Sequence, residues 1–384
     1  MVPPSAAPEL SSLPDPGALP RAGALAAEHI VELLRAGAVR AAGASGRVQP
    51  CSLDLTLGSE CWRLPGSLLP LPGETVEGLV REHGRELLDL SVPRVLERGQ
   101  VYLVRLEETL QLPAWLGAYT NNKSSIGRMD VQTRTLTDGN PRYDKVARGY
   151  AGPLWAEITP RSFAVEMQAG CSLNQAIFYG RREVLDTTAV EQLMRREALV
   201  LDANGHTLDE RAVPVDDGIL LSADLEQDVA GFVAKPTHAV ASLVPGRQRP
   251  GSEFFEPLPR PTKGRLLLRR GQFHILSTRE RIRIPPDHAV EMLPYETSAG
   301  EFRAHYAGFF DPGFGWSPEG CGRGTPAVLE LRPYDDDVLL RHGQPICRMA
   351  FERMAAPPQR PYGASGSGSH YNEQRGPRLS RHFT

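Results

Sequence analysis

Short apolar runs separated by Gly and Pro recur along the chain, and they predict a protein built mainly of β-strands. Examples are Val101–Leu106, Arg265–Leu268, Phe273–Leu276 and Ala327–Leu331. The 37 Gly and 34 Pro residues supply many tight turns between such runs. Short strands alternating with turns at this spacing are typical of β-sandwiches and β-barrels. The pattern therefore predicts a mainly β architecture of one of these two types.

Two stretches depart from this pattern and predict helices, the first over Ala24–Ala42 and the second over Thr188–Val200. Each carries apolar residues at near-helical spacing, such as Leu33 in the first stretch and Val190 and Leu193 in the second. Such spacing places the apolar side chains on one face of a helix. We expect a few short helices beside the strands.

An internal repeat divides the chain into two similar parts. Three features of the first part recur 173 positions further on, Glu157–Pro160 as Glu330–Pro333, Gly170 as Gly343 and Phe178 as Phe351. Arg98–Gln100 likewise matches Arg270–Gln272, and Ser52–Leu55 matches Ser222–Leu225. A repeat of this length predicts two tandem copies of one domain.

The predicted boundaries follow from the repeat and from local composition. Residues 1–20 are rich in Pro, Ala and Ser, which predicts a disordered leader because such a segment buries little apolar surface. The two predicted domains are then 21–205, the first half, and 206–384, the second half. The Pro-rich stretch Arg247–Lys263 is predicted to be a loop inside the second half.

Composition limits the classes of partner. With 41% apolar and 23% charged residues, the chain has the balance of a soluble globular protein. Its net charge of −3 argues against a nucleic-acid partner. The five cysteines show no spacing typical of a zinc site, so we expect free thiols and no metal bound by the protein. No apolar run reaches the roughly 20 residues that span a bilayer, which predicts a cytoplasmic protein without a membrane partner.

The segment Asn121–Arg128 has the residue types that hold a phosphate. It places Lys123, two hydroxyls (Ser124 and Ser125), a glycine and Arg128 within eight positions after an apolar run. Glycine lets backbone N–H groups approach phosphate oxygens, and arginine offers two parallel donors. The alternative is a solvated polar turn. The corresponding part of the second half has Glu296 and lacks the Lys and the Arg, so phosphate binding is expected in the first half alone.

A second informative segment is Ala307–Gly315, which predicts a hairpin with Asp311–Gly313 at its turn, followed by a strand that carries Glu330. A carboxylate among apolar neighbours is costly to bury unless its pKa is raised, so Glu330 is a candidate general base. The alternative is that Glu330 faces solvent through strand alternation. The first half keeps the carboxylate as Glu157 but lacks the Asp-Pro pair of the turn.

These segments together resemble the dCTP deaminase branch of the dUTPase-like superfamily. The resemblance is carried by the opening strand Gln49–Gly58, the loop Lys123–Arg128, Asp311–Phe314 with Val328–Glu330, and the tail with Tyr362 and His370–Arg381. It implies two dUTPase-like domains, each a distorted β-barrel or jelly roll. Three departures stand out: Lys123 replaces an arginine, His370 replaces a lysine, and residues 316–324 form an insertion.

The resemblance also implies roles for individual residues. The implied catalytic residues are Ser124, Arg128 and Glu330, and the implied substrate contacts are Lys123, Ser125, Asp311, Val328, Tyr362, His370 and Gln374. Sites in this superfamily are shared between neighbouring domains, so we expect a composite site with the loop from the first half and Glu330 from the second. A less favoured version has Glu157 as the acting carboxylate.

The implied reaction is hydrolytic deamination of dCTP to dUTP and ammonia, in which Glu330 takes a proton from water as the water attacks C4. Mg²⁺ would be bound through the triphosphate, and the zinc-binding pattern of other nucleobase deaminases is absent. The rival activity is that of a dUTP pyrophosphatase, or of a bifunctional enzyme, in which Asp311 activates water. A rival of another class is an inactive nucleotide-binding β-protein. A homo-oligomer is also expected.

Overall fold

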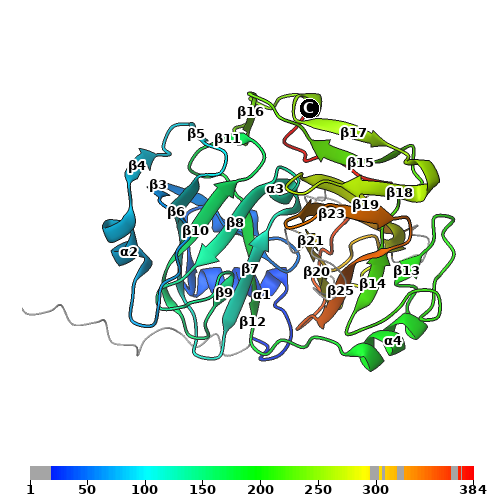
Figure 1. Cartoon of the computed structure of the whole chain (residues 1–384). Helices are drawn as coiled ribbons and strands as arrows, with labels where there is room; N and C mark the ends of the chain where they lie inside the picture. The colour runs from blue at the N-terminus through cyan, green and yellow to red at the C-terminus, as the bar shows by residue number, and fades with distance from the viewer. Residues whose placement is uncertain (1–18, 295–301, 305–307, 318–323, 365–370, 373) are drawn as a thin grey trace, which may run out of the picture.

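The computed structural model describes residues 19–294, 302–304, 308–317, 324–364, 371–372 and 374–384. The predicted fold class is confirmed, because the described residues form mainly strands with four α-helices and three short 3₁₀ segments. Two β-rich bodies lie side by side, coloured blue to green and green to red along the chain (Figure 1). The predicted leader, residues 1–20, lies almost wholly outside the described residues.

Helix α1 is Ala27–Arg35, shorter than the predicted Ala24–Ala42. Its apolar face is buried through residues such as Leu33. The helix stops because Gly37 takes a positive φ of 72°, a conformation that glycine adopts readily and that a helix cannot continue. The chain then forms strand β1 (Val39–Arg40), which pairs with β6.

Helix α4 is Thr187–Arg196 and also ends earlier than predicted. Asp186 caps its start, accepting a hydrogen bond at 2.8 Å from the N–H of Ala189. The chain beyond the helix forms β13 (Val200–Leu201), which pairs with β19. Val190 of α4 packs in the hydrophobic core of the second body, so this helix, which the prediction assigned to the first half, packs with the second.

Three sheets are built wholly or mainly from the first half. The largest has the strand order β4-β3-β6-β10-β8, a second has the order β2-β12-β7-β9, and a third has the order β16-β11-β5. Their strands are β2 (Leu53–Asp54), β3 (Leu57–Leu64), β4 (Glu86–Asp89), β5 (Arg94–Leu96), β6 (Val101–Gln111), β7 (Gly117–Asn122), β8 (Val131–Leu136), β9 (Lys145–Val146), β10 (Ala151–Pro160), β11 (Ala164–Met167), β12 (Asn174–Tyr179) and β16 (Val240–Ser242).

The second half forms sheets whose strands follow a matching order, β17-β15-β19-β23-β21, then β14-β25-β20-β22, then β18-β24. Their strands are β14 (Ile219–Ser222), β15 (Val229–Ala234), β17 (Phe255–Pro259), β18 (Arg265–Leu268), β19 (His274–Ile282), β20 (His288–Pro294), β21 (Phe302–Ala304), β22 (Phe309–Phe310), β23 (Thr325–Pro333), β24 (Val338–Arg341) and β25 (Pro345–Arg353). The strand orders thus correspond between the halves, and gene duplication as their origin stays a prediction.

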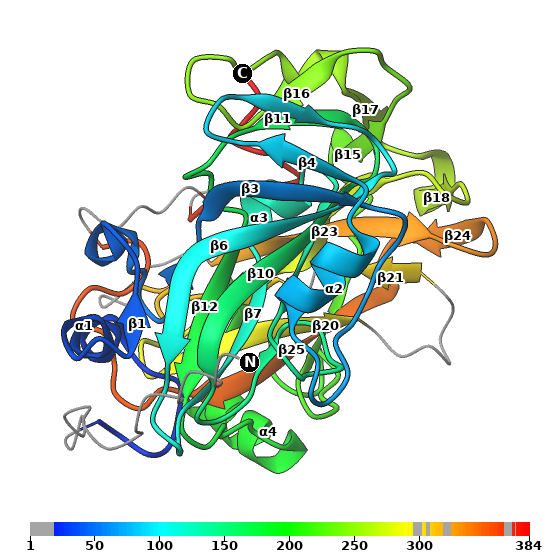
Figure 2. The same cartoon turned by 90° about the vertical axis from the view of Figure 1, so that its left-hand side faces the viewer.

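The smaller helical segments lie at the edges of these sheets. Helix α2 (Val76–His83), which the sequence pattern did not predict, covers the sheet of β3, β6 and β10 and buries Trp155 (Figure 2). Helix α3 is a single turn, Ser124–Gly127. The 3₁₀ segments are η1 (Ala44–Arg47), η2 (Gly251–Glu253) and η3 (Thr262–Gly264). Within the described part of the chain, no helix is long and apolar enough to cross a bilayer.

The two halves share a hydrophobic core and are not merely in contact. Phe254, Phe255 and Phe273 of the second half pack in the same cluster as the core of the first half. Strand β16 of the second half also pairs in parallel with β11 of the first. This continuity fixes the halves against each other, and the candidate site lies along their boundary.

Candidate active site

One cavity of about 180 Å³ lies where the first half meets the second. Both halves supply its walls. The lining residues are Gln49, Asp54, Asn122, Lys123, Ser124, Ser125, Arg128, Gln175, Met292, Gly308, Phe309, Phe310, Asp311, Phe314, Val328, Glu330, Tyr362, Tyr371, Gln374 and Arg381. The structure therefore brings together nine of the residues that the sequence marked. Their chemical roles stay predictions.

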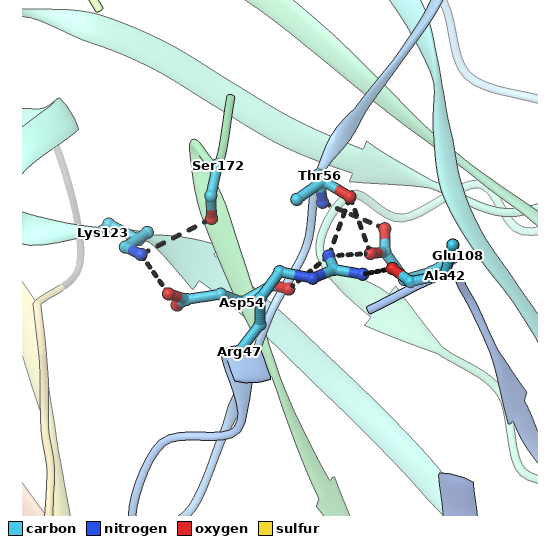
Figure 3. A network of polar contacts seen from close by, with 7 residues as sticks. All are labelled: Ala42, Arg47, Asp54, Thr56, Glu108, Lys123 and Ser172. Atoms are coloured by element: carbon cyan, nitrogen blue, oxygen red, sulfur yellow. Dashed lines mark hydrogen bonds and ion pairs between the residues drawn. The ribbon is translucent and has the colours of Figure 1, made fainter. Parts of the chain in front are cut away.

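The predicted phosphate loop begins where β7 ends and continues into the single turn α3. Lys123 at its start makes an ion pair with Asp54 and donates to Ser172 Oγ at 3.5 Å (Figure 3). The Oδ1 atom of Asp54 is buried and has no hydrogen-bond partner among the described residues. Ser124 Oγ likewise has no hydrogen bond in the described part of the structure. Both atoms are therefore available to a bound molecule.

A second polar cluster holds the backbone beside Lys123 in place (Figure 3). Arg47 donates to the carbonyl of Asp54 at 3.1 Å and to Thr56 Oγ1 at 2.7 Å, and it pairs with the buried Glu108. Glu108 also accepts from the N–H of Thr56 at 3.0 Å. These bonds fix strand β2, and through Asp54 they fix the position of Lys123.

Arg128, at the end of the loop, is buried with only 3% of its surface exposed. Its guanidinium donates to Gln374 Oε1 at 3.2 Å from both terminal nitrogens and to the carbonyl of Arg378 at 3.0 Å. It also lies over the ring of Tyr371, 3.9 Å from the ring centre. Burial lowers the pKa of Arg128, which nevertheless stays cationic at any physiological pH.

Glu330 lies on β23 in the middle of its sheet, opposite Ile275 of β19. Its exposed fraction is 4%, so the alternative that it faces solvent is wrong. Burial raises the pKa of Glu330 to about 8, and the nearby charge of Arg128 only partly offsets this effect. No ion pair reaches Glu330 within the described residues. A carboxyl in this state is protonated at neutral pH and can both give and take a proton.

Asp311 faces the same cavity from the turn that follows β22. Cys51 of the first half donates its thiol proton to Asp311 Oδ1 at 3.4 Å. Burial raises the pKa of Asp311 to about 6, and the nearby Asp54 adds to the rise. Cys51, Cys61, Cys171 and Cys347 are free thiols, as expected, and Cys321 lies outside the described residues.

The predicted hairpin around Asp311 is wrong. A turn does follow β22, but β22 pairs with β20, whereas β23 pairs with β19 and β21. The strands on the two sides of the turn therefore belong to different sheets. Proximity in sequence suggested direct pairing, and the tertiary structure assigns each strand another partner. The turn thus places Asp311 and Glu330 on different walls of one cavity.

The C-terminal tail, residues 371–384, forms another wall of the cavity. Gln374 donates from Nε2 to the carbonyl of Pro326 at 2.9 Å, and Ser380 Oγ donates to the carbonyl of Ser125 at 2.6 Å. Just upstream, the N–H of Tyr362 donates to the carbonyl of Pro312 at 2.8 Å. The tail of the second half thus bridges to the phosphate loop of the first. His370 lies outside the described residues.

Gly313 allows the chain to approach closely at this point. Its φ is 94°, and a Cβ atom here would lie 2.9 Å from the carbonyl oxygen of Tyr362. Only glycine combines this backbone angle with this contact at low cost. The turn beside Asp311 and the segment that carries Tyr362 are therefore packed backbone to backbone.

An ion pair between the halves holds the loop against strand β23, which carries Glu330. Asp130, two residues after Arg128, is fully buried and pairs with Arg332, two residues after Glu330. Arg332 also donates to Ser162 Oγ at 3.2 Å. The backbone of Asp130 has a φ of 56°, which aspartate tolerates better than most residues. This clamp sets the spacing between Arg128 and Glu330.

Glu157, the alternative catalytic carboxylate, does not line this cavity. It is buried in the first half and pairs with Arg134. It accepts hydrogen bonds from Ser67 Oγ at 3.0 Å, the N–H of Leu68 at 3.2 Å and Tyr143 Oη at 3.1 Å. Every one of these partners belongs to the first half, so the structure separates Glu157 from the phosphate loop and from the tail.

Several lining residues were not among the predicted site residues. Asp54 and Gln49 lie in the opening strand whose sequence carried part of the resemblance, and Tyr371 lies in the tail segment that carried another part. Those segments were the available signal, although no role was assigned to these three residues. Phe314 likewise lies in a segment that carried the resemblance. Phe309 and Phe310 gave no comparable signal, because apolar residues in a β-protein are ordinarily core residues.

The side chains present give a limited test of metal binding. Among the described residues, no group of three or more His, Cys, Asp or Glu side chains is arranged to hold a metal ion. Asp54 and Asp311 are two carboxylates that face one cavity. Asp54 is already paired with Lys123, so this pair alone makes a poor cation cage.

Two family models match the chain almost from end to end. The C-terminal domain of 2'-deoxycytidine 5'-triphosphate deaminase matches residues 186–383, and the N-terminal domain of the same family matches residues 21–182. A protein of Beutenbergia cavernae named dCTP deaminase, dUMP-forming, is 31% identical over 173 residues, which are 44% of this chain and 84% of that protein. A protein of the same name from Methanoculleus marisnigri is 30% identical over 167 residues, 42% of this chain and 81% of the relative.

A solved structure is similar over a longer span. The crystal structure of 2'-deoxycytidine 5'-triphosphate deaminase from Agrobacterium tumefaciens is 38% identical in sequence and gives a TM-score of 0.79. The similarity covers 88% of this chain and 99% of that chain. Both halves of the present chain therefore have counterparts in a single solved protein.

Proposed function

Because the chain belongs to the dCTP deaminase family, we propose that it converts dCTP and water to dUTP and ammonia in the cavity between its two halves. The observation that carries this proposal is the buried carboxyl of Glu330, whose pKa burial raises to about 8. A carboxyl with a pKa near the working pH is an efficient general acid and base. Its presence beside Ser124 and Arg128 argues against the rival of an inactive nucleotide-binding protein.

The raised pKa also sets the order of proton transfers. Glu330 begins protonated and donates its proton to N3 of the cytosine, which makes C4 more electrophilic. The carboxylate then accepts a proton from water as the water oxygen bonds to C4, and it passes that proton to the amino group. The C4–N bond breaks, ammonia leaves, and Glu330 recovers a proton from the new C4 hydroxyl. The sequence-based mechanism began with Glu330 as a base, and this order begins with it as an acid.

The phosphate loop and the tail would bind the triphosphate. Lys123, Arg128 and Arg381 line the cavity and supply positive charge, and Ser124 and Ser125 supply hydroxyl donors. In this structure Gln374 accepts the hydrogen bonds of Arg128. A triphosphate would compete for the same guanidinium, so substrate binding would move Gln374 and with it the tail.

Hydrolysis of the product onward to dUMP and pyrophosphate is a second candidate activity. Asp311 faces the same cavity, and its pKa of about 6 leaves it ionised at neutral pH, as a base for attack of water on the α-phosphate requires. The relatives from Beutenbergia cavernae and Methanoculleus marisnigri are both named dUMP-forming. We favour dUTP as the product because Asp311 is already engaged by Cys51 and by the neighbouring charge of Asp54.

Mg²⁺ would enter with the nucleotide and neutralise charge on its phosphates. Asp54 Oδ1, a buried acceptor without a partner in the described residues, is the protein atom best suited to contact that ion or its water.

Association into a homo-oligomer and a cytoplasmic location stay predictions. Sedimentation of the purified chain and fractionation of its native cells test them.

Product analysis tests the proposal directly. The full chain is incubated with dCTP and Mg²⁺, and nucleotides are separated by chromatography for the wild type, Glu330→Gln and Asp311→Asn. We expect dUTP and ammonia from the wild type and from Asp311→Asn, and neither from Glu330→Gln. Accumulation of dUMP that stops in Asp311→Asn would establish the second candidate. Turnover by Glu330→Gln at the wild-type rate would refute the proposed role of Glu330.

A further inference from the structure

A second and larger cavity, of about 560 Å³, lies on the other side of the C-terminal tail. Apart from Ala203, its described walls come from the second half, including the end of β19, the start of β23 and the tail. The lining residues are Ala203, Arg281, Gly315, Trp316, Ser317, Gly324, Thr325, Asn372, Gln374 and Arg375. The described lining residues include no carboxylate, and the volume is within the range of small-molecule sites.

Two arginines give this second cavity its charge. Arg281 and Arg375 both line it, and neither side chain makes a hydrogen bond or an ion pair with any described residue. The nearby Arg279, by contrast, lies 3.6 Å from the carboxylate of Glu280. Two guanidinium groups that have no carboxylate partner among the described residues repel each other and attract an anion. Phosphate, which guanidinium groups bind through paired donors, is the anion that fits best.

Trp316 supplies an aromatic surface beside these charges. It is half-buried, and its ring has no aromatic partner among the described residues. Stacking of a base on such a ring stabilises many complexes between proteins and nucleic acids. Gly315, directly before Trp316, has a positive φ angle of 65° and ends a turn. Positive charge beside an unstacked indole matches a nucleoside phosphate.

The tail connects this second cavity to the first. Gln374 lines both cavities, and its side-chain amide holds Arg128 on one side and the carbonyl of Pro326 on the other. Asn372 lines the second cavity and accepts a hydrogen bond from the N–H of Gly315 at 3.0 Å. A molecule bound against Asn372 and Arg375 would therefore touch the segment that also forms a wall of the active site.

We propose that the second cavity is a separate binding site for a nucleoside triphosphate, with the phosphates on Arg281 and Arg375 and the base on Trp316. Occupancy of this site alters substrate affinity at the first cavity through Gln374. The binding claim stands on the geometry of the second cavity, and only the effect on catalysis rests on the proposed deaminase function.

Calorimetric titration with dCTP tests the binding claim in the full-length Glu330→Gln background, where we expect no turnover. We expect two binding events per chain in this background and one after the further change Arg281→Gln, whose second-site dissociation constant should rise at least about tenfold. Arg279→Gln is the matched control, because Arg279 lies two residues away and outside the cavity, and it should keep both events. A single event in all three proteins would overturn the proposal.

Two further measurements separate the parts of the proposal. Trp316→Ala should weaken second-site binding of dCTP while leaving binding of inorganic tripolyphosphate unchanged, and equal loss or no loss for both probes would contradict base stacking. In the otherwise wild-type chain, Arg281→Gln should keep kcat and change the dependence of rate on dCTP concentration. If the first cavity binds no dCTP while the second does, the proposed function fails and the second site stands. Circular dichroism checks that each variant is folded.

Discussion

Glu330 and Glu157 occupy matching positions in the two halves, yet their surroundings are opposite in character. Glu157 is held by an arginine, two hydroxyl donors and a backbone N–H. Glu330 is just as buried but has no ion pair within the described part of the chain, and its pKa is raised to about 8. A buried carboxylate with many donors is a structural anchor. A buried carboxyl without them can exchange protons with a substrate.

The largest expected effect is on catalysis. Glu330→Gln should lower kcat for dCTP deamination by about 10³-fold, because a neutral amide cannot exchange protons with N3, water and the leaving amine. Glu157→Gln should leave kcat within about twofold of the wild type. Both rates can be measured from ammonia release. Equal loss in the two variants would show that the comparison between the two carboxylates is mistaken.

The next largest effect is a loss of stability, and it is expected for the substitution of Glu157. Glu157→Gln should lower the free energy of unfolding by about 3 kcal/mol, because it leaves the charge of Arg134 without its buried partner. Denaturant titration of both Glu→Gln variants measures this quantity. Glu330→Gln serves as the control, since it removes no ion pair. A more stable Glu157→Gln protein would contradict the anchoring role.

A smaller effect is the pH dependence of the protein's stability that arises from the titration of Glu330. Its pKa is higher in the folded chain, about 8, than its ordinary value of 4.5, so the folded state binds the proton more tightly. Wild-type stability therefore falls as pH rises from about 5 to 8, relative to Glu330→Gln, and levels off above 8. We expect a relative change of about 2 kcal/mol, since water can enter around the ionised group. Melting temperatures of both proteins at pH 5, 7 and 9 measure it.

The smallest effect concerns the clamp between the halves. Asp130→Asn keeps the shape of the side chain but removes its ion pair with Arg332, so the loop with Arg128 should sit less firmly against Glu330. We expect kcat to fall by about tenfold, equivalent to about 1.4 kcal/mol. The pH profile of the remaining activity should keep its shape and shift slightly to lower pH, because the charge of Asp130 is a minor contribution to the raised pKa of Glu330. Loss of the proton-exchanging group itself would instead leave no such profile to measure.

The sequence showed that Glu157 and Glu330 correspond, but it did not show which of the two carboxylates is held by an ion pair and hydrogen bonds. Apolar runs and glycine-rich turns identified the β-fold, and the repeat aligned Glu157 with Glu330. The partners of Glu157 are Ser67, Leu68 and Tyr143, far from it along the chain, so no local pattern could show that this carboxylate is occupied. The hairpin prediction failed for the same reason, because strand partners such as β20 for β22 are chosen by tertiary packing.

The residues of the site were easier to predict from the sequence than the contacts that their side chains make with one another. Lys123, Ser124 and Arg128 lie within six consecutive positions, and their residue types alone indicated phosphate binding. The ion pair of Lys123 with Asp54 and the contact of Arg128 with Gln374 join segments far apart in sequence. Only folding brings these atoms together. Tyr371, which stacks under Arg128, was therefore missed although its sequence segment was noticed.

The end of the tail has a consequence for how substrate enters. Phe383 packs against Phe254 and Phe255 with ring centres 5.0 and 5.6 Å apart, and Thr384 is hydrogen-bonded to Arg249 and Gly251. The tail is thus tethered beyond the site as well as before it, at Tyr362. Displacing Gln374 from Arg128 would open a short closed loop and not a free end. Because both ends stay tethered, the segment would lose less chain entropy when Gln374 returns to Arg128 than a free end would lose.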